Sequence, residues 1–220
     1  MWRWFVALPA APALCASAMA EPPSGLVSLA DVAPAIVQDM RYAGADNFLG
    51  RPVPGYARAE CWLTPQTAQA LARAQAIAAR EGLSLIVWDC YRPPKATAAF
   101  AAWARDPADQ ARKADYYPVL DKAELFARGY IGARSVHSLG AAVDVGLTRD
   151  GQTLDFGSGY DLFDPRSATA SRAVLPLAQA NRARLKRIME SAGFANYARE
   201  WWHYGLKGAR GGRAFEADVE

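Results

Sequence analysis

The chain has 220 residues, with 25 Lys and Arg, 22 Asp and Glu and only two His, which gives a formal net charge of +3 at pH 7. This near balance excludes the strongly basic composition of a typical nucleic-acid-binding protein and gives no reason to expect an anionic membrane as partner. The length suits one domain with a full hydrophobic core, and no repeat or low-complexity linker divides it.

The first 20 residues, MWRWFVALPAAPALCASAMA, predict a secretory leader that is cleaved after Ala20. The apolar run Phe5–Ala18 follows one positive charge, and small residues precede the expected cleavage point. Pro9 and Pro12 interrupt the run, which is also shorter than the ~20 apolar residues of a good membrane span. A retained anchor is the less favoured alternative.

Cleavage would leave a mature domain of residues 21–220, which we expect to be exported, to lie in the periplasm and to have no stable membrane insertion. Loss of Arg3 lowers its formal charge by one, from +3 to +2. A lipoprotein site at Cys15 is a weaker alternative, because the preceding leucine is larger than the small residue that such sites prefer.

Two cysteines remain in the mature chain, Cys61 and Cys90, and an exported protein can keep them oxidised. A disulfide between them would close a loop of about 30 residues and stabilise the fold by roughly 3 kcal/mol. The alternative is a pair of buried thiols. A zinc site built on these cysteines is less favoured, because neither cysteine belongs to a CxxC pair.

The clearest local pattern predicts a helix followed by a strand in the first half of the chain. Thr64 can cap a helix, Pro65 suits its first position, and alanine-rich sequence continues to Gly82, which suits a helix end. The apolar run Leu83–Trp88 then predicts a buried strand. A second helix is expected from Lys95 to Arg105.

The second half alternates irregular segments, strands and one long helix. Residues 106–121 are polar and predict a surface loop. AAVDVGLTRDGQTLDFG predicts two strands joined by a turn at Asp150-Gly151. We expect a helix over 178–191 that ends at Gly193, and a last strand in EWWHYGL, residues 200–206. Helices mixed with hairpins, without regular βαβ alternation, predict an α+β domain.

Both histidines lie in segments whose composition suggests a metal site. In SVHSLGAAVD, His137 precedes a predicted strand that carries Asp144, and zinc accepts imidazole and carboxylate ligands. A third ligand must come from elsewhere, and His203 is the only other histidine. Glu200, three residues before it, is the candidate general base of a metal-assisted hydrolase. Taken alone, His137 could be a structural histidine and Asp144 a turn cap.

The combined pattern Ser-x-His-x-x-Gly-x-Ala-x-Asp and Glu-x-Trp-His resembles the zinc D-alanyl-D-alanine dipeptidases of the VanX type. This family lies within a larger group that includes D,D-carboxypeptidases and proteins with the hedgehog-like fold. Further similar segments occur in the same order over nearly all of the expected mature chain: RYAGADNFLGRPVPGY, VWDCYRP, YYPVLDKAELFARGYIGARSVHS, GSGYDLFDPRS and NRARLKRIMESAGFANYAREWWHY.

The resemblance implies a single domain with a central, mainly antiparallel sheet flanked by helices. It implies one zinc ion per chain, held by His137, Asp144 and His203. Glu200 would activate water and pass the proton to the leaving amine, and Arg92 would face the scissile carbonyl. A surface salt bridge is the alternative reading of Arg92.

The same resemblance implies three residues that bind substrate. Asp161 would pair with the substrate ammonium, Ser135 would hydrogen-bond to the carboxylate end, and Tyr42 would line the pocket. Phe100 would line the side-chain pocket or belong to the core. Asp161 could instead be a turn residue after two glycines.

The implied function is hydrolysis of the free dipeptide D-Ala-D-Ala to two D-alanines in cell-wall turnover or recycling. A D,D-carboxypeptidase that acts on peptidoglycan stem peptides is the first alternative, and an inactive binding module is the least favoured. The leader and the cysteines argue against an antibiotic-resistance role, because that role requires the cytoplasm. The sequence does not indicate an oligomeric state.

Overall fold

The computed structural model describes residues 21–209 and 212–219, so the expected leader and its cleavage point lie outside the described residues. Within the described ranges, no helix is both long and apolar enough to cross a membrane. The elements follow one another in the order β1 (Val27–Ser28), α1 (Leu29–Val32), β2 (Val37–Gln38), η1 (Arg41–Ala43), β3 (Trp62–Leu63), α2 (Pro65–Ala79), β4 (Ser84–Asp89), α3 (Pro94–Arg105), α4 (Lys113–Tyr116), α5 (Lys122–Leu125), η2 (Val136–Leu139), β5 (Ala142–Arg149), β6 (Gln152–Thr153), η3 (Pro165–Ser167), α6 (Pro176–Ser191), β7 (Phe194–Asn196) and β8 (His203–Leu206).

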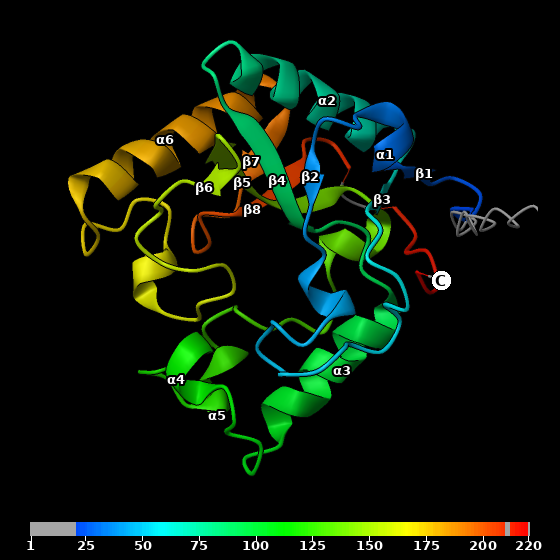
Figure 1. Ribbon diagram of the computed structural model, residues 1–220. Helices are drawn as coiled ribbons and strands as arrows, with labels where there is room; N and C mark the ends of the chain where they lie inside the picture. The colour runs from blue at the N-terminus through cyan, green and yellow to red at the C-terminus, as the bar shows by residue number, and fades with distance from the viewer. Residues whose placement is uncertain (1–20, 210–211, 220) are drawn as a thin grey trace, which may run out of the picture.

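The central sheet has six strands in the order β2-β4-β5-β8-β7, with β6 paired to the end of β5. The β2–β4 pair is parallel and the remaining pairs are antiparallel. Helices α2 and α6 lie on one side of the sheet, and α3, α4 and α5 lie on the other (Figure 1). The predicted α+β domain with a mainly antiparallel sheet is confirmed.

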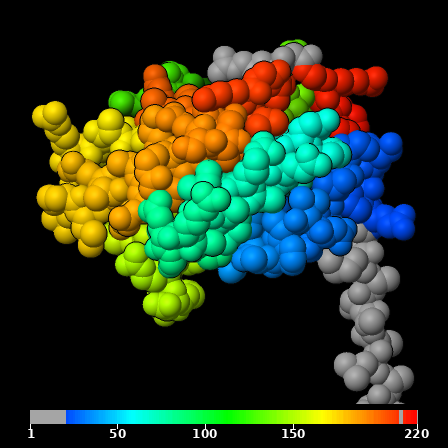
Figure 2. Space-filling model, turned by 90° about the horizontal axis from the view of Figure 1, so that it is seen from above, coloured from blue at the N-terminus to red at the C-terminus, as the bar shows by residue number. Residues whose placement is uncertain are grey.

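The helix after Thr64 forms for the reasons that the sequence indicated. The Thr64 hydroxyl accepts a hydrogen bond from the Thr67 amide, and Pro65 occupies the first turn, where no intrahelical donor is needed. The helix ends at Ala79, before the left-handed Gly82. Helices α2 and α6 pack side by side over the sheet, as Figure 2 shows in teal and orange.

Side chains along β5 point alternately into the main core and toward the face of the sheet that carries polar groups. Val143, Val145 and Leu147 belong to the core cluster beneath α2 and α6. Asp144 points to the opposite face, because successive side chains of a strand alternate. The register places Asp144 beside Asp89 of β4 and His203 of β8. Three neighbouring strands therefore present acidic and imidazole groups side by side.

The structure corrects two of the expected elements. Residues 106–121 are not simply a surface loop: they contain α4, and Tyr116 and Tyr117 are buried in a second, aromatic-rich cluster with α3. The strand expected over 200–206 begins only at His203, because residues 198–202 form the turn that connects it to the unpredicted β7. The predicted hairpin turn is confirmed, with positive φ at Asp150 and Gly151.

Candidate metal centre and active site

Three side chains from separate elements converge on the polar face of the sheet. His137 projects from the short helix η2, just before β5, whereas Asp144 lies within β5. His203 is the first residue of β8 and the cross-strand partner of Asp144. Cross-strand partners lie about 5 Å apart, so the register alone brings these two side chains together.

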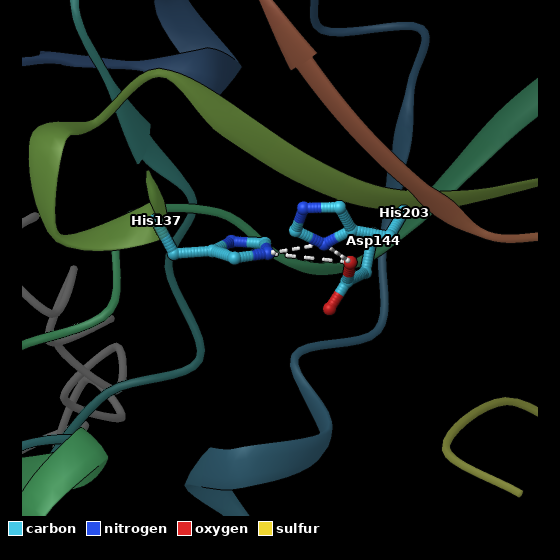
Figure 3. Close-up of side chains that lie close together, drawn as sticks. All are labelled: His137, Asp144 and His203. Atoms are coloured by element: carbon cyan, nitrogen blue, oxygen red, sulfur yellow. Dashed lines mark hydrogen bonds and ion pairs between the residues drawn. The ribbon is translucent and has the colours of Figure 1, made fainter. Parts of the chain in front are cut away.

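The potential ligand atoms form a small triangle (Figure 3). His137 Nε2 lies 3.1 Å from His203 Nδ1 and 3.3 Å from Asp144 Oδ1. His203 Nδ1 lies 2.9 Å from Asp144 Oδ1. His137 and Asp144 are buried, and His203 is partly buried at the wall of a cavity.

Neighbouring groups orient these ligand atoms toward one another. His137 Nδ1 donates to the Cys90 carbonyl oxygen at 2.7 Å, which leaves the Nε2 lone pair facing the centre. The Tyr160 hydroxyl donates to Asp144 Oδ2 at 3.1 Å and leaves Oδ1 on the inner side. Burial lowers the pKa of His203, so its imidazole is neutral near pH 7 and can offer a lone pair.

The donor set fits a zinc ion. Bonds of about 2.0–2.2 Å in a tetrahedron place neighbouring ligand atoms roughly 3.3–3.6 Å apart, close to the three separations found here. Two imidazole nitrogens and a carboxylate oxygen also form a catalytic zinc set, which leaves the fourth position open. Without a cation, two acceptors, His137 Nε2 and Asp144 Oδ1, would face His203 Nδ1, which has at most one proton for both.

Gly140 allows the chain to turn between His137 and Asp144. Its φ is +60°, in the left-handed region that glycine adopts without steric cost. A Cβ at this position would lie 2.5 Å from Leu26 Cδ2 and 3.2 Å from the Thr64 amide nitrogen. The invading side chain would therefore disturb the packing that places η2.

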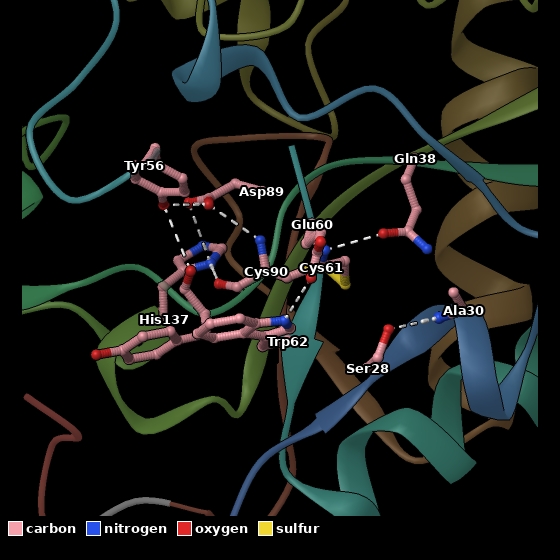
Figure 4. The surroundings of a disulfide bond; sticks show 11 residues. Ser28, Ala30, Gln38, Tyr56, Glu60, Cys61, Trp62, Asp89, Cys90 and His137 are labelled. Carbon is pink, nitrogen blue, oxygen red and sulfur yellow. Dashed lines mark hydrogen bonds and ion pairs between the residues drawn. A yellow bond between two sulfur atoms is a disulfide. The ribbon is translucent and has the colours of Figure 1, made fainter. Parts of the chain in front are cut away.

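Asp89, which the sequence analysis did not single out, holds the surroundings of the site together (Figure 4). Its Oδ2 accepts from Arg92 Nε at 2.8 Å and Nη2 at 2.7 Å, and lies 3.4 Å from His137 Nδ1. Its Oδ1 accepts from the Tyr56 hydroxyl at 2.6 Å. A charged residue at the end of a buried strand, three positions before Arg92, was the available signal for this role.

Arg92 lies beside the two carboxylates of the centre, Asp89 and Asp144. Beyond Asp89, its guanidinium lies 3.6 Å from Asp144 Oδ2, and it packs over the rings of Tyr42 and Phe100 at 5.4 and 5.0 Å. Its side chain is only 14% exposed. Arg92 therefore does not form the exposed surface salt bridge that was its alternative interpretation. It is a fixed cation in the wall of the cavity.

Glu200 lies in the turn between β7 and β8. Its amide donates to the Tyr197 carbonyl oxygen, and its own carbonyl oxygen accepts from Asn196 Nδ2 at 3.0 Å. Burial raises the pKa of Glu200 well above its usual range, and the Asp144 carboxylate raises it further. The turn brings Glu200 to the cavity that His203 also lines.

The predicted substrate-binding residues reach the same cavity from other segments. Asp161 is buried, accepts from the Tyr42 hydroxyl at 2.8 Å and has a left-handed backbone with φ of 60°. Burial raises the pKa of Asp161 well above its usual range. Ser135 caps η2 by accepting from the His137 amide at 3.2 Å. Phe100 is both buried and part of the cavity wall.

One cavity of about 600 Å³ unites these groups. The eighth residue predicted for the site, His137, is buried behind the cavity wall. The other seven line the cavity: Tyr42, Arg92, Ser135, Asp144, Asp161, Glu200 and His203.

The sequence pattern of a peptidase M15 family, described as D-Ala-D-Ala dipeptidase, matches residues 23–217. The chain belongs to this family.

Proteins with curated names from several bacteria are similar to the chain over most of their length. A D-alanyl-D-alanine dipeptidase of Streptomyces coelicolor is 46% identical over 171 residues, which cover 77% of this chain and 85% of that protein. One from Enterococcus faecium is 38% identical, with 83% and 92% covered. One from Escherichia coli is 36% identical, with 82% and 84% covered.

The disulfide that the M15 chain was expected to contain is present. Cys61 and Cys90 are bonded, with their Cα atoms 5.2 Å apart (Figure 4). The bond ties the segment before β3 to the end of β4, and the Cys90 carbonyl is the acceptor for His137. The disulfide therefore lies next to the backbone group that orients His137.

Proposed function

We propose that this chain is a zinc-dependent dipeptidase that hydrolyses D-Ala-D-Ala to two D-alanines. The observation that carries the proposal is one cavity in which a His-Asp-His triangle, a half-buried glutamate, a fixed arginine and a buried aspartate meet. Membership of the M15 family and the similarity to curated dipeptidases support the same activity.

His137, Asp144 and His203 would hold the zinc ion, one per chain. When bound there, zinc supplies a Lewis acid that polarises the scissile carbonyl and lowers the pKa of water from 15.7 toward ~7. Tyr160 and the Cys90 carbonyl keep the ligand atoms oriented, as outer partners of metal ligands commonly do.

Glu200 would act as general base and then as general acid. Its carboxylate accepts the proton of the attacking water and returns that proton to the leaving amine nitrogen. A raised pKa suits both steps, because a group with a pKa near the working pH both accepts and releases a proton readily.

Arg92 would stabilise the oxyanion that develops on the scissile carbonyl. The Asp89 carboxylate receives two of its N–H groups, and the rings of Tyr42 and Phe100 restrict the guanidinium plane. A donor fixed in this way costs no reorganisation when charge appears, and one such donor contributes about 3 kcal/mol to transition-state stabilisation.

Asp161 would recognise the free ammonium of the dipeptide. Its carboxyl group is buried and accepts a hydrogen bond from Tyr42, but no cationic side chain forms an ion pair with it within residues 21–209 and 212–219. A substrate ammonium would supply the missing countercharge and favour the ionised carboxylate. The Ser135 hydroxyl, which accepts from the His137 amide, still has a proton to donate to the substrate carboxylate.

This arrangement favours a free dipeptide over a stem peptide. An acylated amine carries no charge, so its binding would leave the Asp161 carboxylate buried and uncompensated. The same reasoning makes D,D-carboxypeptidase activity the second candidate, to be tested by comparing D-Ala-D-Ala with an N-acylated tripeptide that ends in D-Ala-D-Ala.

We further infer that the mature enzyme works outside the cytoplasm, in cell-wall turnover. The support is the leader predicted for residues 1–20 together with the disulfide, since disulfides persist mainly in oxidising compartments. N-terminal sequencing of the protein from a periplasmic extract tests the predicted cleavage after Ala20.

The decisive experiment measures hydrolysis of D,D-, L,D- and L,L-dipeptides by zinc-loaded and chelator-treated protein. We expect zinc-dependent release of D-alanine from D-Ala-D-Ala. Glu200→Gln should retain zinc and lower kcat at least ~100-fold, in line with general-base catalysis. Zinc-loaded protein that leaves D-Ala-D-Ala intact would refute the substrate, and a fully active Glu200→Gln variant would refute the base.

A further inference from the structure

Arg182 of α6 is a fully buried cation that bonds to backbone carbonyls rather than to a carboxylate. Its Nε donates to the Phe156 carbonyl oxygen at 2.7 Å. Its Nη1 donates to the carbonyl oxygens of Arg166 and Ala168 at 2.7 and 2.8 Å. Its Nη2 donates to Ser158 Oγ at 3.1 Å. No ion pair of Arg182 occurs among the residues that the structure describes.

The bonded carbonyls mark the two ends of one segment, residues 156–168, which we call the recognition loop. Its middle carries Tyr160, which donates to the metal-side Asp144, and Asp161, the proposed ammonium-binding residue. Asp161 has a left-handed backbone, which is uncommon for a residue other than glycine, so the course of the chain on either side must support it. A single guanidinium therefore closes the base of the loop that presents Asp161.

The same network connects the recognition loop to the turn that carries Glu200. Ser158 Oγ accepts from Trp201 Nε1 at 2.9 Å as well as from Arg182. The Trp201 amide donates to the Ser167 carbonyl oxygen at 3.0 Å, and its indole stacks on Phe156 with ring centroids 4.0 Å apart. Trp201 directly follows Glu200 in the chain.

We propose that Arg182 is a positioning residue for substrate recognition: by joining both ends of the recognition loop, it holds Asp161 at a fixed place relative to Glu200. The proposal rests on the proposed function, because it assigns Arg182 an effect that passes through the Asp161 carboxylate. Arg182 itself lies outside the cavity and touches no substrate.

The hydrogen bonds made at position 182 explain why this residue is an arginine. Burying a cation without a carboxylate partner is costly, and burial indeed lowers the pKa of Arg182 to about 10. The planar guanidinium offers five N–H donors in a rigid fork, so one group spans three carbonyls and a hydroxyl. A lysine ammonium is a point donor that cannot reach both ends of the loop at once.

The test is a double-mutant cycle with Arg182→Lys and Asp161→Asn, assayed on D-Ala-D-Ala. We expect Arg182→Lys to raise KM about tenfold and to change kcat much less, because misplacing a binding group by a fraction of an ångström is costly. In the Asp161→Asn background, Arg182→Lys should raise KM no further. The proposal would be overturned if Arg182→Lys raised KM by the same factor in the wild-type and Asp161→Asn proteins, or if it left KM unchanged.

Two controls separate positioning from a general loss of stability. Ile188→Val removes a buried methyl from the same helix and leaves every hydrogen bond of Arg182 to the loop in place, so it should leave KM unchanged. Ser158→Ala removes the hydrogen bonds that the Ser158 hydroxyl accepts from Arg182 and Trp201 and the one that it shares with Ser167. If Arg182→Lys does not fold, Ser158→Ala takes its place in the cycle, and additivity of its effect on KM with that of Asp161→Asn would equally overturn the proposal.

Backbone hydrogen exchange provides a readout that does not need activity. Amides of residues 156–168 should exchange at least ~10-fold faster in Arg182→Lys, whereas those of β5 should keep the wild-type rate. Unchanged exchange in the loop would overturn the proposal even if the enzyme is active. A wild-type enzyme inactive on D-Ala-D-Ala would instead refute the proposed function, and the exchange experiment would still decide whether Arg182 holds the loop.

Discussion

Breaking the Cys61–Cys90 disulfide should destabilise the protein by an amount that follows from the loop it closes. The two cysteines are 29 residues apart in the sequence. In the chain-entropy treatment, releasing a loop of this length gives the unfolded state about 3.5 kcal/mol of additional stability at 25 °C. For a domain of this size, that change corresponds to a fall in Tm of roughly 7–14 °C.

The measurement is equilibrium unfolding of residues 21–220 in guanidinium chloride, with and without a thiol reductant, followed by the fluorescence of their five tryptophans. This part of the chain has no third cysteine that could exchange with the disulfide, and a chelator keeps zinc from contributing to the free energy of unfolding. A difference below about 1 kcal/mol would refute the loop-entropy argument.

The metal centre provides a second readout of the same perturbation. The Cys90 amide donates to Asp89 Oδ1 at 3.0 Å, so a bond other than the disulfide also holds the carbonyl that orients His137. Zinc affinity of the folded, reduced protein should therefore stay within about threefold of the oxidised value, compared with the 10–100-fold loss typical when an outer partner of a ligand is removed. A larger loss would mean that the disulfide shapes the native site rather than restraining the unfolded chain.

Three further outcomes follow from individual contacts. Tyr160→Phe removes the donor to Asp144 Oδ2, so zinc affinity in a chelator competition should fall about 10-fold. Gly140→Ala places a Cβ against Leu26 at a positive φ, and thermal denaturation should show a loss of about 2 kcal/mol. Burial raises the pKa of Asp161, so the zinc-free folded protein binds a proton more tightly than the unfolded chain, and its stability falls as pH rises above about 4 toward that raised pKa. Asp161→Asn should make this fall shallower, with the contribution of the raised Glu200 pKa left in place, and denaturation between pH 4 and 8 measures it; parallel curves for variant and wild type would contradict it.

Sequence reasoning succeeded where a local signal fixed the structure. The cap at Thr64, the helix through the alanine-rich stretch and the turn at Asp150-Gly151 depend on contacts within a few residues. The buried tyrosines of residues 106–121 were missed because their burial depends on α3, which packs against them from another part of the chain. The polar composition of residues 106–121 predicted only their exposed side chains.

The sequence pointed to the three residues of the candidate metal site, but not to the residues that support them. His137, Asp144 and His203 stand out because histidine is rare in this chain and the motifs around both histidines resemble those of a zinc family. Asp89 and Arg182 also lie in segments that resemble the family, but their residue types alone indicate no particular role, because an aspartate at a strand end and an arginine in a basic helix have common structural roles. Their importance depends on strand register and on carbonyls brought together by the folded loop.

The charges of the cavity suggest why metal and substrate should bind cooperatively. Four carboxylates, those of Asp89, Asp144, Asp161 and Glu200, are brought together around one arginine, Arg92. The arginine neutralises one negative charge and a divalent zinc ion two, which leaves one charge for a substrate ammonium to neutralise. Because an uncompensated buried charge is costly, each cation should strengthen the binding of the other. A neutral acylated amine would leave this last charge in place, so the electrostatics that hold zinc in the site would also select a free dipeptide.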